Sequence, residues 1–360
     1  MNNVVKNINF TGLTPEELEQ FLKSIGQPKY RAGQIFSWIH GRVVQSFSQM
    51  TDLPADFRQQ LENDCSLEVP NILSIHDSGN TGSRKFLMEL SDGAKVEAVF
   101  LPEQKRRTVC ISSQVGCPLA CKFCATGMMG LVRNLTAAEI VAQLYAIKRE
   151  VGGRITNVVF MGMGEPFLNY NAVIKAAQLI HHKSGLNIGA RKITISTSGI
   201  ASRIRQMADE NHPFRLAFSL NATTDQIRGH IMPINLKHDL TACLDSLEYY
   251  SSRTRQRVTV EYILLPGVND SKEDAERLIK IIRRLRAKLN VIPFNPVPDT
   301  PYRQPNQNEL KQFVSKVEPA VRRVTVRWSQ GSDISAACGQ LYAENVKRKR
   351  RPTDKTQQPA

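Results

Sequence analysis

Three cysteines in one short segment are the residues of this sequence best suited to carry chemistry. Cys117, Cys121 and Cys124 have the spacing C-x3-C-x2-C and follow an apolar stretch that predicts a strand at 108–112. A loop with this spacing can place three thiolates on three corners of a cubane [4Fe–4S] cluster, which normally takes four thiolate ligands. One iron then stays open for a substrate or cofactor. We therefore expect an iron–sulfur cluster with an open iron.

The alternative for these cysteines is a structural zinc site. Such a site closes with four ligands, usually as two C-x2-C pairs or as C-x2-C with H-x3-H. The sequence has a single C-x2-C pair and none of its seven histidines lies near it, although Cys110 could supply a fourth ligand. The spacing favours the cluster. Cys65 and Cys243, outside the segment, are expected to be buried core residues.

The charge of the chain indicates a polyanionic partner. Its 360 residues include 48 Lys and Arg against 33 Asp and Glu, a net charge of +15. Neutralisation of phosphates by such side chains dominates the affinity of proteins for nucleic acids. One basic cluster is usually a solvated face, but several together favour RNA or DNA. The clusters are 105–107, Arg253/Arg255/Arg257, 283–288 and 347–351.

Composition disfavours secreted and membrane proteins. The N-terminal segment lacks the apolar region of a signal peptide, and no later run approaches the ~20 apolar residues of a membrane span. Seven cysteines are an odd number, and three are grouped like ligands, so a disulfide scaffold is not expected. We expect a cytoplasmic protein without a membrane partner, and a monomer by default.

The first 70 residues predict a helical accessory module. A helix is expected over 13–26, with Thr14 as N-cap, Pro15 at the first helical position and Glu17 completing a capping box. Helical stretches at 30–40 and 54–61 follow. The sequence does not distinguish a module that packs on RNA from an ordinary cap on the next domain.

Residues 71–102 predict a β-hairpin extension. The stretches 85–90 and 94–101 are expected to be strands on either side of a glycine turn. Apolar residues from Ala94 to Phe100 alternate onto one face of the second strand, which places Glu97 on the other. On position alone, Glu97 is expected to be a solvated carboxylate.

Strands and helices alternate between residues 103 and 342, which predicts an α/β domain. Six βα units with apolar strands indicate a parallel sheet buried on both faces. The motifs follow the strands, so they should meet at the carboxyl ends, where α/β barrels carry active sites. The basic tail 343–360 is expected to be disordered. Strands are expected near 108–112, 155–160, 192–197, 214–220, 257–264 and 290–294, and helices near 136–151, 171–182, 200–209, 239–251, 271–288 and 306–317.

The segment from Gly162 to Pro166 follows the second of these strands. A dinucleotide fingerprint needs G-x-G-x-x-G opening directly into a helix, and Glu165-Pro166 breaks that pattern, so NAD is not expected. Glycines at a strand end let a ligand approach the backbone. The carboxylate of Glu165 could then pair with an ammonium group.

Several motifs together resemble the radical S-adenosylmethionine (SAM) superfamily. C-x3-C-x2-C with Phe123 before the last cysteine is similar to its cluster motif. The surrounding segments resemble one branch closely, the RlmN family of RNA adenine methyltransferases, with the related Cfr enzymes. The likeness runs from about Leu13 to Leu341. Its segments are CISSQVGCPLACKFCATG, MGMGEP, TISTSG, PFNP and DISAACGQL.

The resemblance implies an incomplete (βα)6 TIM-like barrel, with a [4Fe–4S] cluster on the three cysteines and SAM bound beside it. It also implies 23S rRNA as substrate, tRNA as a second substrate, and an electron donor such as flavodoxin. The residues that match the family's SAM contacts are Gly164, Glu165, Ser196, Ser219, Leu220, Asn221 and Asn295.

The resemblance further implies methylation of adenine C2 with two SAM molecules per turnover. This carbon is electron-poor and cannot attack the methyl of SAM as an amine would, a requirement that a radical route avoids. One SAM methylates Cys338, and a radical from the second removes a hydrogen atom from that methyl so that its carbon adds to the base. Cys110 then releases the product through a transient Cys110–Cys338 disulfide, with Glu97 as proton acceptor.

Two alternatives stay open. Enzymes of the Cfr branch methylate adenine C8, and the cluster cysteines, Cys110 and Cys338 are common to both branches. The segments QVGCPLACKFCATGMMG and QPKYRAGQIFSWIH resemble the C2 branch more closely. The other alternative is a zinc-stabilised RNA-binding protein without catalysis, which would be colourless, whereas an iron–sulfur protein is brown.

Overall fold

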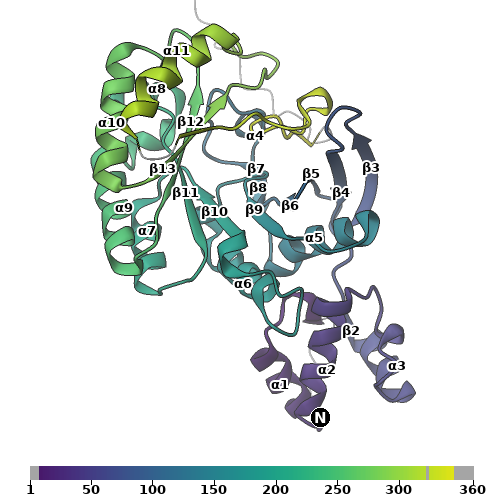
Figure 1. Ribbon diagram of the computed structural model, residues 1–360. Coiled ribbons are helices and arrows are strands. Elements are labelled where there is room, and N and C mark those ends of the chain that lie inside the picture. The colour runs from purple at the N-terminus through teal and green to yellow at the C-terminus, as the bar shows by residue number, and fades with distance from the viewer. Residues whose placement is uncertain (1–7, 322–323, 344–360) are drawn as a thin grey trace, which may run out of the picture.

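A ten-stranded sheet forms the body of the molecule (Figure 1). The computed structural model describes residues 8–321 and 324–343, so the basic cluster 347–351 and nearly all of the predicted tail lie outside the described residues. The sheet order is β14-β13-β12-β11-β10-β9-β6-β5-β4-β3. The strands are β3 Asn71–Asp77, β4 Arg84–Glu89, β5 Lys95–Glu103, β6 Arg106–Cys110, β9 Asn157–Phe160, β10 Ile193–Thr197, β11 Arg215–Ser219, β12 Thr259–Leu264, β13 Lys288–Pro293 and β14 Val324–Val326.

The seven strands from β6 to β14 in this order are parallel, and helices follow them. All six predicted strands are present, as β6 and β9 to β13. The sheet curls but ends at β14 and β3, so the expected incomplete barrel is confirmed. The sequence analysis did not predict β14, which has only three residues and therefore too little length for a periodic pattern.

The antiparallel strands β3 to β5 extend the same sheet. The predicted hairpin is confirmed, with Glu89 opposite Lys95 across a turn in which Gly93 has a φ of 81°. On its other side β5 pairs with β6, so the hairpin is continuous with the barrel. Strand β3 was not predicted because none of its side chains is fully buried, and its sequence lacks an apolar alternation.

Most helices begin at side-chain N-caps, which the sequence supplies at Thr136, Asp239, Ser271 and Asn306. The prediction of a helix to residue 288 was wrong, because α10 ends at Leu285, where Arg286 turns left-handed with a φ of 48°. The barrel helices are α4 Ala125–Met129, α5 Ala137–Val151, α6 Tyr170–His181, α7 Ala201–Asp209, α8 Asp225–Ile231, α9 Leu240–Thr254, α10 Lys272–Leu285 and α11 Gln307–Val317.

The N-terminal module is helical, as predicted, and packs against the barrel (Figure 1). The capping box is confirmed, because Thr14 N donates to the Glu17 carboxylate at 2.8 Å and Glu17 N donates to Thr14 Oγ1 at 3.3 Å. Buried His40 lies 2.5 Å from the hydroxyl of Tyr145 on α5. The elements are α1 Pro15–Ser24, α2 Tyr30–Phe36, a π-helical turn Ser37–Arg42, α3 Ala55–Asp64 and the paired strands β1 Ile8–Asn9 and β2 Cys65–Ser66.

One apolar core runs from the module into the barrel, and a second cluster surrounds the cysteine segment. Cys65 and Cys243 are buried, as expected. Within the described part of the chain, no helix has the length and apolarity needed to cross a membrane.

Candidate active site

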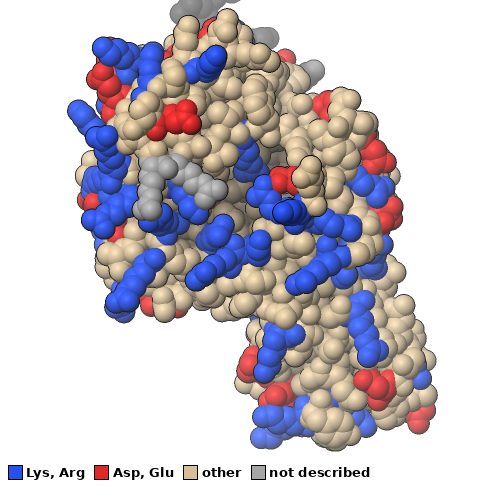
Figure 2. All heavy atoms as spheres, viewed as in Figure 1, with Lys and Arg blue, Asp and Glu red and all other residues tan. Residues whose placement is uncertain are grey.

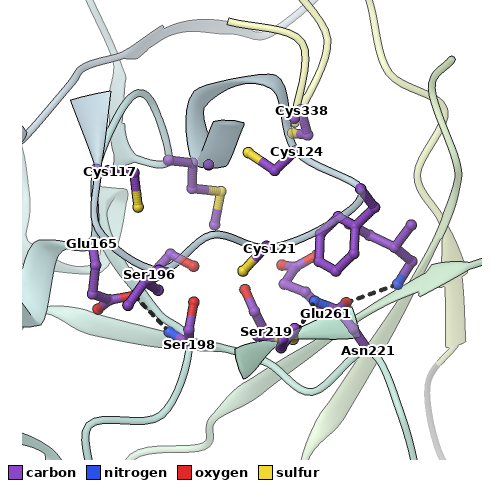
Figure 3. Close-up of a pocket in the computed structure, with 18 of the residues that line it drawn as sticks. Cys117, Cys121, Cys124, Glu165, Ser196, Ser198, Ser219, Asn221, Glu261 and Cys338 are labelled. Atoms are coloured by element: carbon purple, nitrogen blue, oxygen red, sulfur yellow. Dashed lines mark hydrogen bonds between the residues drawn. The ribbon is translucent and has the colours of Figure 1, made fainter. Parts of the chain in front are cut away.

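The cysteine segment lies at the carboxyl ends of the parallel strands, as predicted. After β6 the chain forms an unpredicted hairpin, β7 Gln114–Cys117 with β8 Gly130–Asn134. Cys117 ends β7, Cys121 lies in the following turn, and Cys124 is the N-cap residue of α4. Figure 3 shows their sulfur atoms directed into one cavity.

The three cysteines fit an iron–sulfur cluster. Burial raises the pKa of Cys117 to about 12 and that of Cys121 well above its usual range, with nearby thiols adding to the effect. Such thiols ionise when a metal supplies the compensating charge. Each cysteine of a cubane ligates a different iron, so the three sulfur atoms need not converge on a point.

The zinc alternative fits the side chains poorly. A structural zinc ion needs four ligand atoms around one centre. Among the residues that the structure describes, no three His, Cys, Asp or Glu side chains are grouped closely enough to hold a single metal ion. The described side chains therefore do not supply the four-ligand set that a structural zinc ion needs.

Glu165 faces the cysteines from the strand side of the same cavity (Figure 3). Its Oε1 accepts a hydrogen bond from Phe167 N at 3.0 Å and its Oε2 accepts one from Ser198 N at 2.8 Å. Burial raises the pKa of Glu165, while these hydrogen bonds oppose the shift. The preceding Gly164 has a φ of 99°, and a Cβ there would lie 2.6 Å from Cβ of Gln114. The backbone therefore requires glycine at this position.

The ends of two neighbouring strands contribute more polar groups to this cavity. Asn221 adopts a left-handed conformation with a φ of 55°, and its Oδ1 accepts a hydrogen bond from Ile263 N at 3.0 Å. Leu220 is fully buried outside the cavity lining, and its N donates to the carbonyl of Glu261 at 3.0 Å. The predicted SAM contacts that do line the cavity are Gly164, Glu165, Ser196, Ser219 and Asn221.

A buried arginine that the sequence analysis did not identify connects these loops. Arg228 of α8 donates to the carbonyl of Leu220 from Nε at 3.1 Å and to the carbonyl of Ser198 from Nη2 at 2.5 Å. It thereby joins the loops after β10 and β11. An arginine in a short helix is usually exposed, so no local signal distinguishes it.

Cys338 reaches the cavity on a C-terminal segment that packs against the cysteine loop. The carbonyl of Gly339 accepts a hydrogen bond from Ala125 N at 2.7 Å, and Thr126 Oγ1 donates to the carbonyl of Leu341 at 2.6 Å. Asn295 does not line the cavity; its Nδ2 donates to the carbonyl of Cys338 at 3.1 Å. Asn295 therefore positions the segment that carries Cys338, and the structure places no part of its side chain in the cavity lining.

Cys110 ends β6 and is buried near Cys338. Burial raises the pKa of Cys110 to about 12; the charge of Cys338 adds to the shift and that of Arg327 opposes it. The two sulfur atoms are therefore close enough for their charges to interact. All seven cysteines are free thiols, so the Cys110–Cys338 disulfide implied by the resemblance is not formed in this structure.

The expectation that Glu97 is solvated was wrong. Its side chain pairs with Lys85 Nζ at 3.0 Å, and its Oε2 accepts a hydrogen bond from Tyr342 N at 2.8 Å. Glu97 is only 3 % exposed, because the C-terminal segment covers that face of the hairpin. The alternation of side chains along one strand cannot reveal that a distant segment of the chain will cover one of its faces.

A second cavity occupies the lumen of the barrel below the first. Its volume is about 580 Å³, within the range of small-molecule sites. On β12, Thr259 lines only the lumen, Glu261 lines both cavities, and Ile263 lines only the upper one. Cys338 and Met161 also line both. The two cavities therefore meet at this level of the barrel.

The lumen cavity has basic residues at the beginnings of the strands. Arg106, Arg215 and Lys288 are the first residues of β6, β11 and β13, and Arg191 precedes β10. Figure 2 shows Lys and Arg side chains gathered around a hollow on the face seen in Figure 1. We call the opening of the lumen that these four basic residues line the basic mouth. It has the charge that a polyanionic substrate requires.

An open parallel barrel with three loop cysteines above its first strand defines the radical SAM class. The family model described as "Radical SAM superfamily" matches residues 111–284, and the model described as "Ribosomal RNA large subunit methyltransferase N-terminal domain" matches residues 8–67. This protein is therefore a radical SAM enzyme. The cofactors of this class are a [4Fe–4S] cluster and SAM.

Similar proteins identify the family within this class to which the chain belongs. The chain is 45 % identical to a dual-specificity RNA methyltransferase RlmN of Geobacter sulfurreducens, over 93 % of this chain and 92 % of that protein. It is 41 % identical to a probable RlmN of Syntrophomonas wolfei, over 96 % and 99 % of the two chains. A radical SAM methyltransferase structure from Sphaerobacter thermophilus superposes with a TM-score of 0.89 at 41 % identity, covering 93 % of this chain and 99 % of that one. The chain belongs to the RlmN family.

Proposed function

We propose that this protein methylates C2 of a specific adenosine in 23S rRNA, and also of an adenosine in tRNA. The observation that carries the proposal is the position of Cys338, which lies where the cavity of the cysteine loop meets the lumen. The relatives are named as dual-specificity RNA methyltransferases, and the model that matches the N-terminal module is described as a domain of a ribosomal RNA large subunit methyltransferase. Both support an RNA substrate.

The residues divide the work as follows. The cluster would be held by Cys117, Cys121 and Cys124, with the SAM amino group at Glu165. When bound, these cofactors would supply the radical chemistry that takes a hydrogen atom from a methyl group on Cys338. That methyl group comes from an earlier SAM molecule by ordinary displacement at the Cys338 thiolate.

The methylene carbon of Cys338 bonds to C2 of the base, and the product must then be released. Glu97 accepts the proton that leaves C2, and the unpaired electron left on the adduct would return to the cluster. The thiolate of Cys110 then attacks the sulfur of Cys338. The carbon–sulfur bond breaks and leaves its electron pair on the methylene carbon, which takes up a proton and becomes the methyl group, while the two sulfur atoms form a disulfide that the electron donor reduces before the next turnover. The interaction between the charges of Cys110 and Cys338 supports this pairing, and the positive charge of Arg327 opposes the burial that disfavours the Cys110 thiolate.

The RNA-binding surface, the oligomeric state and the electron donor are also part of the proposal. We propose that RNA approaches the basic mouth of the lumen rather than the predicted clusters alone. Arg284 of one cluster is already paired with Asp245 at 2.5 Å and with Glu248 at 2.8 Å. We further propose a cytoplasmic monomer that takes its electrons from a donor such as flavodoxin.

The test is an anaerobic reaction of reconstituted protein with SAM, a reductant and ribosomal RNA that lacks the modification. Nucleosides from the digested RNA are compared with methyladenosine standards by mass spectrometry. The proposal predicts 2-methyladenosine. A product at C8 would move the protein to the Cfr-like alternative, and the absence of either product despite SAM cleavage would refute the RNA substrate.

A further inference from the structure

We propose that Glu261 recognises the exocyclic amino group of the target base and so makes the enzyme select adenine over guanine. This inference rests on the proposed function, because it assumes that an RNA base enters the lumen. It adds a specificity-determining residue that lies outside all the predicted motifs.

The carboxylate of Glu261 lacks part of its hydrogen bonding. The side chain is only 5 % exposed, and Oε1 accepts a hydrogen bond from Asn290 Nδ2 at 2.9 Å. Its Oε2 is buried and has no hydrogen-bond partner among the described residues. A buried carboxylate oxygen without a partner is costly and uncommon, so we infer that a ligand supplies the missing donor.

The place of Glu261 in the barrel indicates which ligand this is. Ile263, two residues further along the same face of β12, lines only the cavity of the cysteine loop, whereas Thr259 lines only the lumen. Glu261 lies between them and, like Cys338, lines both cavities. A base inserted from the lumen toward Cys338 therefore passes this carboxylate.

The charges at this level suit an amino donor. Burial raises the pKa of Glu261, and the positive charge of Arg327, which lines both cavities, opposes that rise and favours the ionised carboxylate. An ionised carboxylate has only acceptors. Adenine presents an amino group at C6, which donates, whereas guanine and hypoxanthine present an oxygen there, which would face Oε2 unfavourably.

The test compares two RNA substrates that differ only at the target nucleotide. One carries adenosine and the other carries purine riboside, which lacks the amino group. For the wild-type enzyme we expect the methylation rate on purine riboside to be at least about 10-fold lower. In Glu261→Met the ratio of the two rates should approach one, as in a double-mutant cycle. Thr259→Val, a control one step deeper in the lumen, should keep the wild-type ratio.

Glu261→Gln keeps the shape of the side chain and covers the case in which Glu261→Met does not fold. Its amide can donate to an oxygen, so it should raise the rate on inosine relative to adenosine. An undiminished ratio in Glu261→Met, or no gain on inosine in Glu261→Gln, would overturn the inference. Failure of the wild type to methylate adenosine RNA would instead refute the proposed function, and this inference with it.

Discussion

Glu97 accepts a hydrogen bond from the backbone N of Tyr342 at 2.8 Å, four residues beyond Cys338. The same carboxylate pairs with Lys85 at 3.0 Å. The hairpin thereby holds the C-terminal segment over the cysteine loop. The side chain that we propose as the proton acceptor for the base therefore also anchors the segment that carries Cys338.

Glu97→Gln should separate these two roles. The amide retains the shape and can still accept from Tyr342, but it cannot take the proton from C2. We expect methylated product to fall by about 100-fold or more, with accumulation of a covalent protein–RNA adduct on denaturing gels. Glu89→Gln, which makes the same change to a carboxylate on the neighbouring strand β4, is the control and should not accumulate adduct. Normal turnover by Glu97→Gln would contradict the role of Glu97.

Loss of one cluster ligand should remove the cofactor and the radical chemistry together. In Cys121→Ala, iron and sulfide content after anaerobic reconstitution should fall well below that of the wild type, and SAM cleavage should cease. Cys65→Ala, which changes a buried thiol of the N-terminal module, should retain both. A full complement of iron in Cys121→Ala would show that the ligand set is wrong.

Gly164→Ala should weaken SAM binding without unfolding the barrel. The added Cβ would lie 2.6 Å from Cβ of Gln114, at a φ of 99° that alanine rarely adopts. We expect the dissociation constant of SAM, measured by equilibrium dialysis, to rise at least about 10-fold, since the displaced backbone also carries Glu165. Gly79→Ala, where a Cβ meets nothing within 4 Å, should leave the constant unchanged. Equal effects of the two substitutions would contradict this account of the loop.

Acid should destabilise the protein through His40. Burial lowers the pKa of His40 from 6.5 to about 3, so below pH 6.5 the unfolded chain binds a proton that the folded chain does not. His40 therefore leaves the free energy of unfolding unchanged above pH 6.5. As the pH falls from 6.5 toward 3, the free energy of unfolding decreases by up to about 1.4 kcal/mol per pH unit. In His40→Gln the urea midpoint should fall less between pH 6.5 and 5 than in the wild type. Equal falls would contradict this source of acid sensitivity.

The sequence was sufficient for the barrel because its signals are local. The buried parallel strands are mostly apolar, and each motif follows such a strand, so a single register places them all at one edge. The capping box of Thr14 and the turn at Gly93 depend on a few neighbouring residues and were also predicted. Short elements such as β14, with three residues, and α8, with seven, were missed because a periodic pattern needs a longer stretch to stand out.

The residues that the sequence did not reveal depend on contacts between distant segments. Glu261 on β12 and Arg327 beyond β14 lie near each other in the lumen because β13 pairs with both strands. Arg228 becomes a buried connector only because the loops after β10 and β11 close around it. Glu97 looked solvated because the segment that covers it lies 245 residues further along the chain.

The most direct test of the central claim follows the methyl carbon through Cys338. The protein is first methylated with unlabelled SAM, separated from it, and then given RNA with SAM that carries a trideuterated methyl group. We predict that mass spectrometry finds a methyl group on the Cys338 peptide before RNA is added, and that the first turnover yields a base whose new carbon is unlabelled. A trideuterated methyl group in the first product, or methylation by Cys338→Ala, would contradict the account.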